Sequence, residues 1–264
     1  MSRITDILVI DDEQVVREGL CRVCEAEGFT IDAVGDAKTG LEKLRKGAYR
    51  LVVCDVMLPE QDGFHVLNTM KAEGIDIPLI MITGCSTMQN AVNALKEGAI
   101  DFIPKPFTVD EVESGIKRGL RYQQLAADAG SRGSKMPVFS QPCPPECYRL
   151  GRLSWLRLEP NGIGLVGVTD LFMKTVSNAR ALTFFEMDRE LVQAAPCATL
   201  TTDDNLIHEI LCPLSGNIVA RNETLLSHPE LLRNDPYTNG WLYRINPVNV
   251  GYDLNNLISC SQDY

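Results

Sequence analysis

The chain has no long apolar run. Nowhere in its 264 residues does one approach the roughly 18 to 20 residues that a membrane-spanning helix needs. Its start, MSRITDILVIDDE, brings in acids where a secretion signal would need a long apolar stretch. We therefore expect a cytoplasmic protein without a membrane partner.

Basic side chains are also scarce. Lysine and arginine number 25 against 35 acids, which gives a net charge of −10, and both halves of the chain are acidic. Only two lysines follow residue 125, and no helix-turn-helix pattern follows it. Because nucleic-acid binding relies on basic side chains that neutralise phosphates, we do not expect nucleic acid as a partner.

The composition is that of a packed soluble protein. Hydrophobic residues make up 45% of the chain and charged residues 23%, which excludes disordered and collagen-like classes. The cysteines number nine, an odd count in a chain without a secretion signal, which favours reduced thiols over a disulfide framework.

The length favours two domains. Across residues 1–125, short apolar runs alternate with segments of helical period. This pattern predicts an α/β fold, a doubly wound parallel sheet of five strands covered by helices on both faces. Residues 126–147 lose the pattern and gather Ala, Gly, Ser and Pro, which predicts a linker. Strand-like pieces and turn signals predict a β-rich domain at 148–250, and 251–264 are expected to be a C-terminal tail.

Chemically useful side chains follow the predicted strands of the first half. They are Asp11 and Asp12 after the first strand, Asp55 after the third, Thr83 after the fourth and Lys105 after the fifth. With the strand order 2-1-3-4-5, these strand ends meet where doubly wound sheets bind ligands. Three neighbouring carboxylates repel one another, and carboxylate oxygens suit Mg²⁺, so the sequence predicts a magnesium site.

The same groups suit phosphoryl transfer, which needs positioning and charge neutralisation more than acid–base chemistry. An ionised Asp55 carboxylate can act as the nucleophile without a general base. Thr83 can donate a hydrogen bond to one phosphoryl oxygen, and Lys105 can bring a positive charge to another.

Four motifs in the first half point to a known family. They are VIDDE at 9–13, CDVMLPEQDG at 54–63, MITG at 81–84 and FIPKPF at 102–107. Over about residues 4–124 the chain resembles the receiver domain of two-component response regulators, such as the chemotaxis response regulator. The resemblance implies a flavodoxin-like fold and a sensor histidine kinase that phosphorylates Asp55.

The resemblance also implies how the ion is held. Asp12, Asp55 and the main-chain carbonyl of Met57 would bind magnesium, and Asp11 would act mostly through water. The receiver would catalyse its own phosphorylation and dephosphorylation, and we expect no other enzyme activity.

A switch is implied as well. Thr83 would move toward the phosphoryl group and Phe102 would turn inward behind it, reshaping the surface of the fourth helix, fifth strand and fifth helix. The bond from Lys105 to Pro106 would be cis, as is chiefly seen at proline. Receivers of this family self-associate through that surface, so a homodimer is one expected assembly.

The second half resembles a different family. Its motifs are VGVTDLF at 166–172, CPLSGNIVARNETLL at 212–226, HPELLRNDPY at 228–237 and GWLYRI at 240–245. From about Arg152 to Pro247 they are similar to the H protein of the glycine cleavage system. The resemblance implies a barrel-sandwich hybrid fold, related to lipoyl and biotinyl carriers, with a hairpin that presents a lipoyl-lysine.

This chain lacks that lysine. The lipoyl position falls at Asn205, and no lysine occurs after Lys174. An amide nitrogen is not a useful nucleophile, so we expect no lipoate. Either the domain keeps a recognition surface without the chemistry, or His208, Cys197 or Cys212 supplies a new reactive group.

The leading hypothesis is a response regulator whose second domain binds an unknown protein partner. One alternative is a regulated subunit tied to glycine cleavage or lipoate metabolism. A second is a transcription factor, which the acidic second half argues against, and a third is a phosphate sink without an output. Because the predicted linker is flexible, coupling is expected to occur by exposing or masking one domain's surface.

Overall fold

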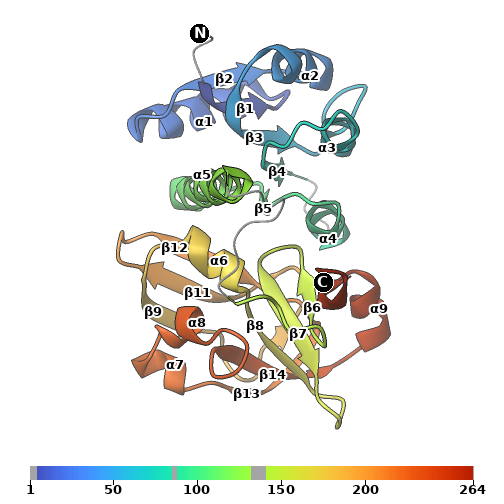
Figure 1. The fold of residues 1–264 in the computed structure, drawn as a ribbon, viewed down its shortest axis with the longest axis vertical. Helices are drawn as coiled ribbons and strands as arrows, with labels where there is room; N and C mark the ends of the chain where they lie inside the picture. Colours follow the sequence, from blue (N-terminus) through green and yellow to red (C-terminus); the bar gives the residue numbers. More distant parts are fainter. Residues whose placement is uncertain (1–4, 85–87, 132–140, 264) are drawn as a thin grey trace.

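The computed structural model describes residues 5–84, 88–131 and 141–263, which form two domains joined through helix α5 (Figure 1). In this described part, no helix is both long enough and apolar enough to cross a membrane.

The first domain is built on a parallel sheet of five strands in the order β2-β1-β3-β4-β5, which confirms the predicted topology. Apolar runs form these strands because the sheet is covered on both faces. The strands are β1 (Thr5–Ile10), β2 (Ile31–Val34), β3 (Tyr49–Asp55), β4 (Leu79–Thr83) and β5 (Asp101–Pro104).

Helices cover both faces of this sheet. Because side chains alternate along a strand, Ile7 and Val9 pack with α1 and α5, while Leu8 and Ile10 pack toward the opposite face. The helices are α1 (Gln14–Ala26), α2 (Ala37–Lys46), α3 (Gly63–Ala72), α4 (Met88–Lys96) and α5 (Val109–Ser131). The strand ends that carry the polar residues stay outside these layers.

The second domain contains a seven-stranded sheet in the order β10-β13-β14-β8-β7-β6-β15 and a three-stranded sheet in the order β12-β11-β9. This β-rich arrangement agrees with the predicted barrel-sandwich fold. The strands are β6 (Tyr148–Leu150), β7 (Ser154–Leu158), β8 (Gly164–Val168), β9 (Ala179–Phe184), β10 (Glu190–Leu191), β11 (Pro196–Thr202), β12 (Ile207–Leu211), β13 (Gly216–Arg221), β14 (Trp241–Pro247) and β15 (Ile258–Ser259). The helices are α6 (Asp170–Thr175), α7 (Thr224–Ser227), α8 (Leu231–Asn234), α9 (Val250–Asn255) and the 3-10 helix η1 (Cys260–Asp263).

Two large aromatic side chains fill the core of this domain. Trp155 is fully buried, and a Cβ added at Gly167 would lie 2.7 Å from its ring, so only glycine fits there. Tyr243 is also fully buried, and its hydroxyl donates to the carbonyl of Cys197 at 2.8 Å. This bond ties the two sheets together, since Tyr243 belongs to β14 and Cys197 to β11.

The expected tail is part of the second domain. Residues 250–263 form α9, β15 and η1, and β15 pairs with β6 at the edge of the large sheet. The expected linker is also shorter, because α5 continues to Ser131 and β6 begins at Tyr148. The middle of the predicted linker, 132–140, lies outside the described residues.

The expectation of reduced thiols is wrong at one place. Cys143 and Cys260 form a disulfide with their Cα atoms 5.9 Å apart. The two cysteines are 117 residues apart in sequence. Their pairing could not be read from spacing because it depends on β15 and η1 folding back beside the segment before β6.

The two domains contact each other along the α4–β5–α5 side of the first domain. Figure 1 shows α5 and α4 facing α6, β12, β6 and α9 of the second domain. Helix α5 contacts both α6 and β12, and α4 contacts β6.

Candidate functional site

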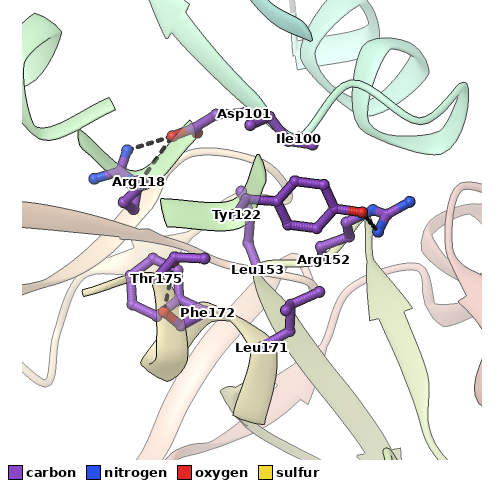
Figure 2. A pocket seen from close by; sticks show the side chains of 9 residues that line it. All are labelled: Ile100, Asp101, Arg118, Tyr122, Arg152, Leu153, Leu171, Phe172 and Thr175. Atoms are coloured by element: carbon purple, nitrogen blue, oxygen red, sulfur yellow. Dashed lines mark hydrogen bonds and ion pairs between the residues drawn. The ribbon is translucent and has the colours of Figure 1, made fainter. Parts of the chain in front are cut away.

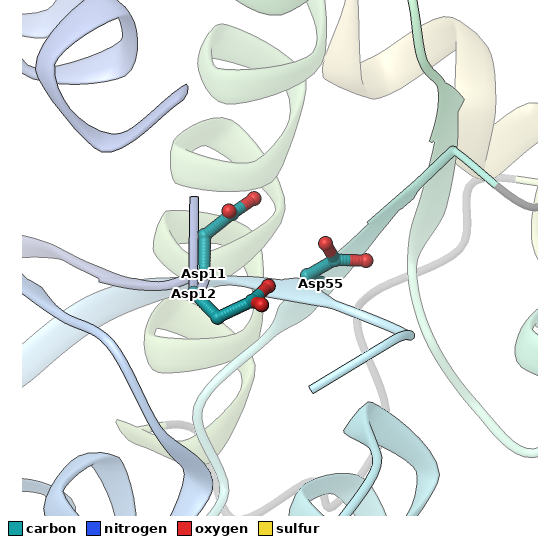
Figure 3. A group of neighbouring side chains, drawn as sticks. All are labelled: Asp11, Asp12 and Asp55. Atoms are coloured by element: carbon teal, nitrogen blue, oxygen red, sulfur yellow. The ribbon is translucent and has the colours of Figure 1, made fainter. Parts of the chain in front are cut away.

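Three carboxylates converge at the carboxyl ends of β1 and β3. Asp11 and Asp12 follow β1 directly, and Asp55 is the last residue of β3, the neighbouring strand. One oxygen from each lies within 4.8 Å of the others, and Figure 3 shows the three side chains around one space. The sequence predicted this juxtaposition from strand order alone.

A lysine whose side chain is 10% exposed joins the acids. Lys105 follows β5, and its Nζ lies 2.9 Å from Asp11 Oδ2, 2.7 Å from Asp55 Oδ2 and 2.7 Å from Glu13 Oε1. Burial acts to lower the pKa of Lys105, but its hydrogen bonds to Asp55 and Glu13 and its ion pair with Asp11 outweigh this and raise the pKa well above its usual value. The ammonium is therefore a fixed positive charge at the acid cluster.

The carboxylates differ in their surroundings. Asp11 is 1% exposed and Asp55 is 4% exposed, whereas Asp12 is exposed. Burial raises the pKa of Asp11, and the opposing effect of Lys105 does not cancel it. Asp11 Oδ2 lies at ion-pair distance from Lys105 but accepts no well-aligned hydrogen bond.

The donor set fits a divalent cation. Each of the three acids offers a carboxylate oxygen, and the under-bonded Asp11 oxygen adds a reason for a positive partner. Magnesium takes oxygen ligands and keeps several waters, which suits a half-open cluster of this kind. Met57 follows in the loop after Asp55, and its N–H donates to Asp55 Oδ1 at 2.9 Å.

Two predicted switch residues lie on β4 and β5, the strands that follow β3 across the sheet. Thr83 is fully buried at the end of β4, the strand that pairs with β3. Phe102 in β5 pairs with Met81 and is 8% exposed. The bond from Lys105 to Pro106, expected to be cis, is cis in the structure.

Glycine is required at the start of α3. A Cβ at Gly63 would lie 2.3 Å from the carbonyl oxygen of Asp55, and the Gly63 N–H donates to the Val56 carbonyl at 2.9 Å. Asp62 caps α3 by accepting from the His65 N–H at 2.8 Å. The main chain at the end of β3 is held closely against the start of this helix.

Two residues beside the site were not assigned from the sequence. Glu13 is the third contact of Lys105, and Arg17 donates to the carbonyls of Asp11 and Asp12 at 2.7 Å and 2.8 Å. The available signal was position: Glu13 directly follows the acid pair, and Arg17 lies one helical turn further on.

The expected lipoyl position of the second domain lies at the tip of a hairpin. Asn205 sits in the turn between β11 and β12 with φ of 61°, and its side-chain oxygen accepts from Arg180 at 3.0 Å. Of the residues considered as new reactive groups, His208 is 1% exposed and Cys197 and Cys212 are fully buried. None of the three reaches the surface as a carrier group would need to.

Comparison with known proteins matches each half separately. Residues 7–117 match the family model of the response regulator receiver domain, and residues 147–263 match that of the glycine cleavage H-protein. The transcriptional regulatory protein DltR of Streptococcus agalactiae is 35% identical over 119 residues, 45% of this chain and 53% of DltR. The response regulator MprA of Mycobacterium ulcerans is 34% identical over 122 residues, 46% of this chain and 53% of MprA.

The chain thus spans about half the length of the curated relatives it matches. Among solved structures, the glycine cleavage system H protein of Mycobacterium marinum is similar at 22% identity. That likeness covers 46% of this chain and 94% of the other, with a TM-score of 0.41.

Proposed function

We propose that this chain, which joins a response regulator receiver domain to a glycine cleavage H-protein domain, is a phosphorylation-controlled binding protein. Asp55 accepts a phosphoryl group from a sensor histidine kinase, and the H-protein domain delivers the output by binding another protein. The observation that carries the first step is the Asp55 carboxylate, nearly buried, paired with Lys105 and facing two further acids.

The acceptor chemistry follows from these contacts. An oxygen of the ionised Asp55 carboxylate attacks phosphorus, and the bond from phosphorus to the donor's imidazole nitrogen breaks. Lys105, already a fixed cation beside Asp55 Oδ2, stabilises one phosphoryl oxygen as charge shifts toward the acceptor. Thr83 donates a hydrogen bond to another.

Magnesium completes the site in this proposal. Asp12, Asp55 and the main-chain carbonyl of Met57 hold it, with Asp11 acting mostly through water. When bound, the ion neutralises charge on the phosphoryl oxygens. Lys105 contacts Asp55 Oδ2, so the lysine and a bound ion would share the oxygens of the Asp55 carboxylate.

The phosphoryl group acts as a switch. Movement of Thr83 and inward rotation of Phe102 change the surface of α4, β5 and α5, which biases two arrangements of the receiver. Self-association through that surface is a further part of this proposal.

Protein binding is favoured over DNA binding for the output. The second half of the chain is acidic and offers few lysines, which suits a protein partner better than phosphates. Asn205 supplies no group for lipoate, so a carrier role in glycine cleavage is the weaker alternative. A phosphate sink without an output is the remaining one.

The test is phosphorylation of the full chain. Incubation with acetyl phosphate and Mg²⁺, followed by intact-mass measurement, is expected to add one acid-stable, base-labile phosphoryl group to the wild type. Asp55→Asn and removal of Mg²⁺ with EDTA are each expected to reduce this to background, whereas Asp76→Asn, which alters an exposed carboxylate, is not. Unchanged phosphorylation of Asp55→Asn contradicts the proposal.

A further inference from the structure

The hairpin formed by β11 and β12 lies against helix α5 of the receiver domain. In the H-protein resemblance this hairpin carries the lipoyl group, and here it is used in a contact within the chain. Ser114 of α5 is 1% exposed, and its hydroxyl donates to the carbonyl of Ile207 in β12 at 2.8 Å. The hairpin therefore bonds directly to the receiver.

A polar chain runs from β5 through α5 into this hairpin. Arg118 donates from Nε to Asp101 Oδ2 at 3.0 Å and makes a second bond to the same oxygen. Its Nη1 lies 2.7 Å from His208 Nδ1. Since guanidinium only donates, His208 accepts at Nδ1 and its Nε2 carries the proton.

A second polar chain returns from the hairpin to α5. His208 Nε2 lies 3.3 Å from the Thr202 hydroxyl, which in turn bonds the Asp204 carboxylate. Asp204 Oδ2 accepts from Ser177 at 2.6 Å and pairs with Arg121 of α5 at 3.2 Å. These hydrogen bonds oppose the effect of burial and lower the pKa of Asp204, so it is ionised at neutral pH.

The contact is closely packed around these groups. A cavity of about 20 Å³, room for about one water molecule, lies between the domains. Figure 2 shows its lining, in which Arg118 meets Asp101 and Arg152 meets Tyr122. A space of this size holds no substrate, so the groups around it serve the contact itself.

Helix α4 makes a separate contact with the end of the chain. Lys96 Nζ donates to the carbonyl of Asn255 at 2.7 Å, and the Tyr252 hydroxyl donates to Gln89 at 2.7 Å. Both α4 and α5 are thus engaged by the second domain, on the same side of the receiver.

We infer that the β11–β12 hairpin, a carrier arm in the related family, is here a docking element that holds the α5 part of the receiver's α4–β5–α5 face, and that phosphorylation releases it. This inference rests on the proposed function. The partner of the hairpin is the receiver of the same chain, so in the unphosphorylated state this face does not self-associate.

Phe102, a predicted switch residue, is connected to this contact through Asp101 and Arg118. Asp101 directly precedes Phe102 in β5, and Asp101 Oδ1 accepts from the Phe102 N–H at 2.9 Å. A rotation of Phe102 changes this main-chain segment and moves the carboxylate that orients Arg118. Because Arg118 bonds both Asp101 and His208, a shift on the receiver side weakens the bond across the interface.

Hydrogen exchange of the full chain tests the inference. Ser114→Glu places a carboxylate against the Ile207 carbonyl, and it is expected to lower protection in 109–121 and 196–211 by tenfold or more. Arg121→Ala removes the partly exposed ion pair with Asp204. Protection from hydrogen exchange in the same segments is therefore expected to fall by roughly fivefold or less. Arg45→Ala, which breaks an exposed pair within the receiver, is the matched control and leaves them unchanged.

Beryllofluoride with Mg²⁺, a phosphoryl mimic, is expected to lower protection of the same segments in the wild type and not in Asp55→Asn. Unchanged protection in Ser114→Glu, with β1 and β3 still protected, overturns the docking role. If Asp55 is phosphorylated by the mass test but beryllofluoride leaves both segments protected, the release is overturned while the proposed function stands. If Asp55 takes up no phosphoryl group, the proposed function fails, and the variants still decide whether the hairpin docks.

Discussion

The carboxylate cluster at Asp55 and the hairpin tip at Asn205 are the two positions at which the family resemblances place chemistry. At Asp55 the reactive carboxylate is present, nearly buried and paired with Lys105. At Asn205 the hairpin and its turn are present, but the side chain is an exposed amide bonded to Arg180. The first position thus offers a carboxylate nucleophile, and the second offers an amide.

The polar groups around Asp55 and around Asn205 differ in what they contact. Around Asp55 they face one small space and one another, as a site for an ion and a phosphoryl group requires. Beside Asn205, the Asp204 carboxylate already accepts hydrogen bonds from Ser177 and Thr202 and pairs with Arg121. The proposed function assigns the first region to a ligand, and the further inference assigns the second to a contact between domains.

Removing the Lys105 ammonium should have the largest effect. Lys105→Met leaves Asp11 and Asp55 buried without a positive partner, so the free energy of unfolding without Mg²⁺ should fall by about 3 kcal/mol. Added Mg²⁺ should stabilise this variant more than the wild type, because the lysine no longer competes for the carboxylates. Urea unfolding with EDTA and with Mg²⁺ measures both effects.

The control for that prediction is Lys43→Met, which breaks a pair with Asp32 that is more than a third exposed. It should change the free energy of unfolding by less than about 1 kcal/mol. An equal gain from Mg²⁺ in Lys105→Met and the wild type contradicts a shared site for the lysine and the ion.

Crowding the acceptor loop should have the next largest effect. In Gly63→Ala the new Cβ meets the Asp55 carbonyl at 2.3 Å, so the loop has to shift. We expect a loss of about 2 kcal/mol in unfolding free energy, as for other overpacked sites, together with slower phosphorylation. Thermal unfolding measures the loss of stability, and the acetyl phosphate reaction measures the rate of phosphorylation. Wild-type stability together with a wild-type rate would contradict the close packing at Gly63.

Gly19→Ala is the matched control, since nothing lies within 4 Å of a Cβ at that position in α1. Alanine favours helix more than glycine does, so this variant should be as stable as the wild type or slightly more stable.

Acid should weaken the hairpin region. Burial and then the charge of Arg118 lower the pKa of His208 from 6.5 to about 3, while Arg121 also lowers it and Asp204 opposes the shift. In the unfolded state His208 is protonated below pH 6.5, whereas in the folded state it stays neutral down to about pH 3. This contribution to stability is present above pH 6.5 and is lost as pH falls.

From about pH 7 to about pH 5, this single group should cost about 2 kcal/mol of unfolding free energy. Asp11 and Glu209 have raised pKa values and act in the opposite direction, so the wild type has to be compared with His208→Gln. Glutamine can still accept from Arg118 and donate to Thr202 but does not titrate. Parallel pH profiles of the two proteins contradict this prediction.

For lipoylation of the chain we expect no effect at all. Wild-type chain incubated with lipoate, ATP and a lipoate ligase should show no mass increase, because Asn205 offers an amide where the ligase needs an amine. An authentic H protein in the same reaction is the positive control. Modification of the wild-type chain would mean that a different residue has taken over as the carrier.

Strand order and the acceptor site were predictable because both depend on local patterns. The apolar strand runs and the polar residues directly after them fix where Asp11, Asp55 and Lys105 meet, and the structure brings them together. Glu13 and Arg17 were not assigned, since their roles depend on side-chain direction rather than on sequence spacing.

The contact between domains was not predictable in the same way. Arg118 and His208 are 90 residues apart, and each alone looks like an ordinary surface arginine or a lone histidine. The extension of α5 and the return of β15 to β6 also depend on packing across the chain. Long-range contacts of this kind leave no periodic signal in the sequence.

Release of the second domain on phosphorylation is tested most directly by small-angle X-ray scattering of the full chain, with in-line size exclusion, in Mg²⁺ alone and in Mg²⁺ with beryllofluoride. We expect a compact monomer in Mg²⁺ and an increased radius of gyration per molecule with beryllofluoride, and no change for Asp55→Asn. Identical scattering of the wild type in both conditions, with beryllofluoride shown to be bound, would contradict the claim that charge at Asp55 separates the two domains.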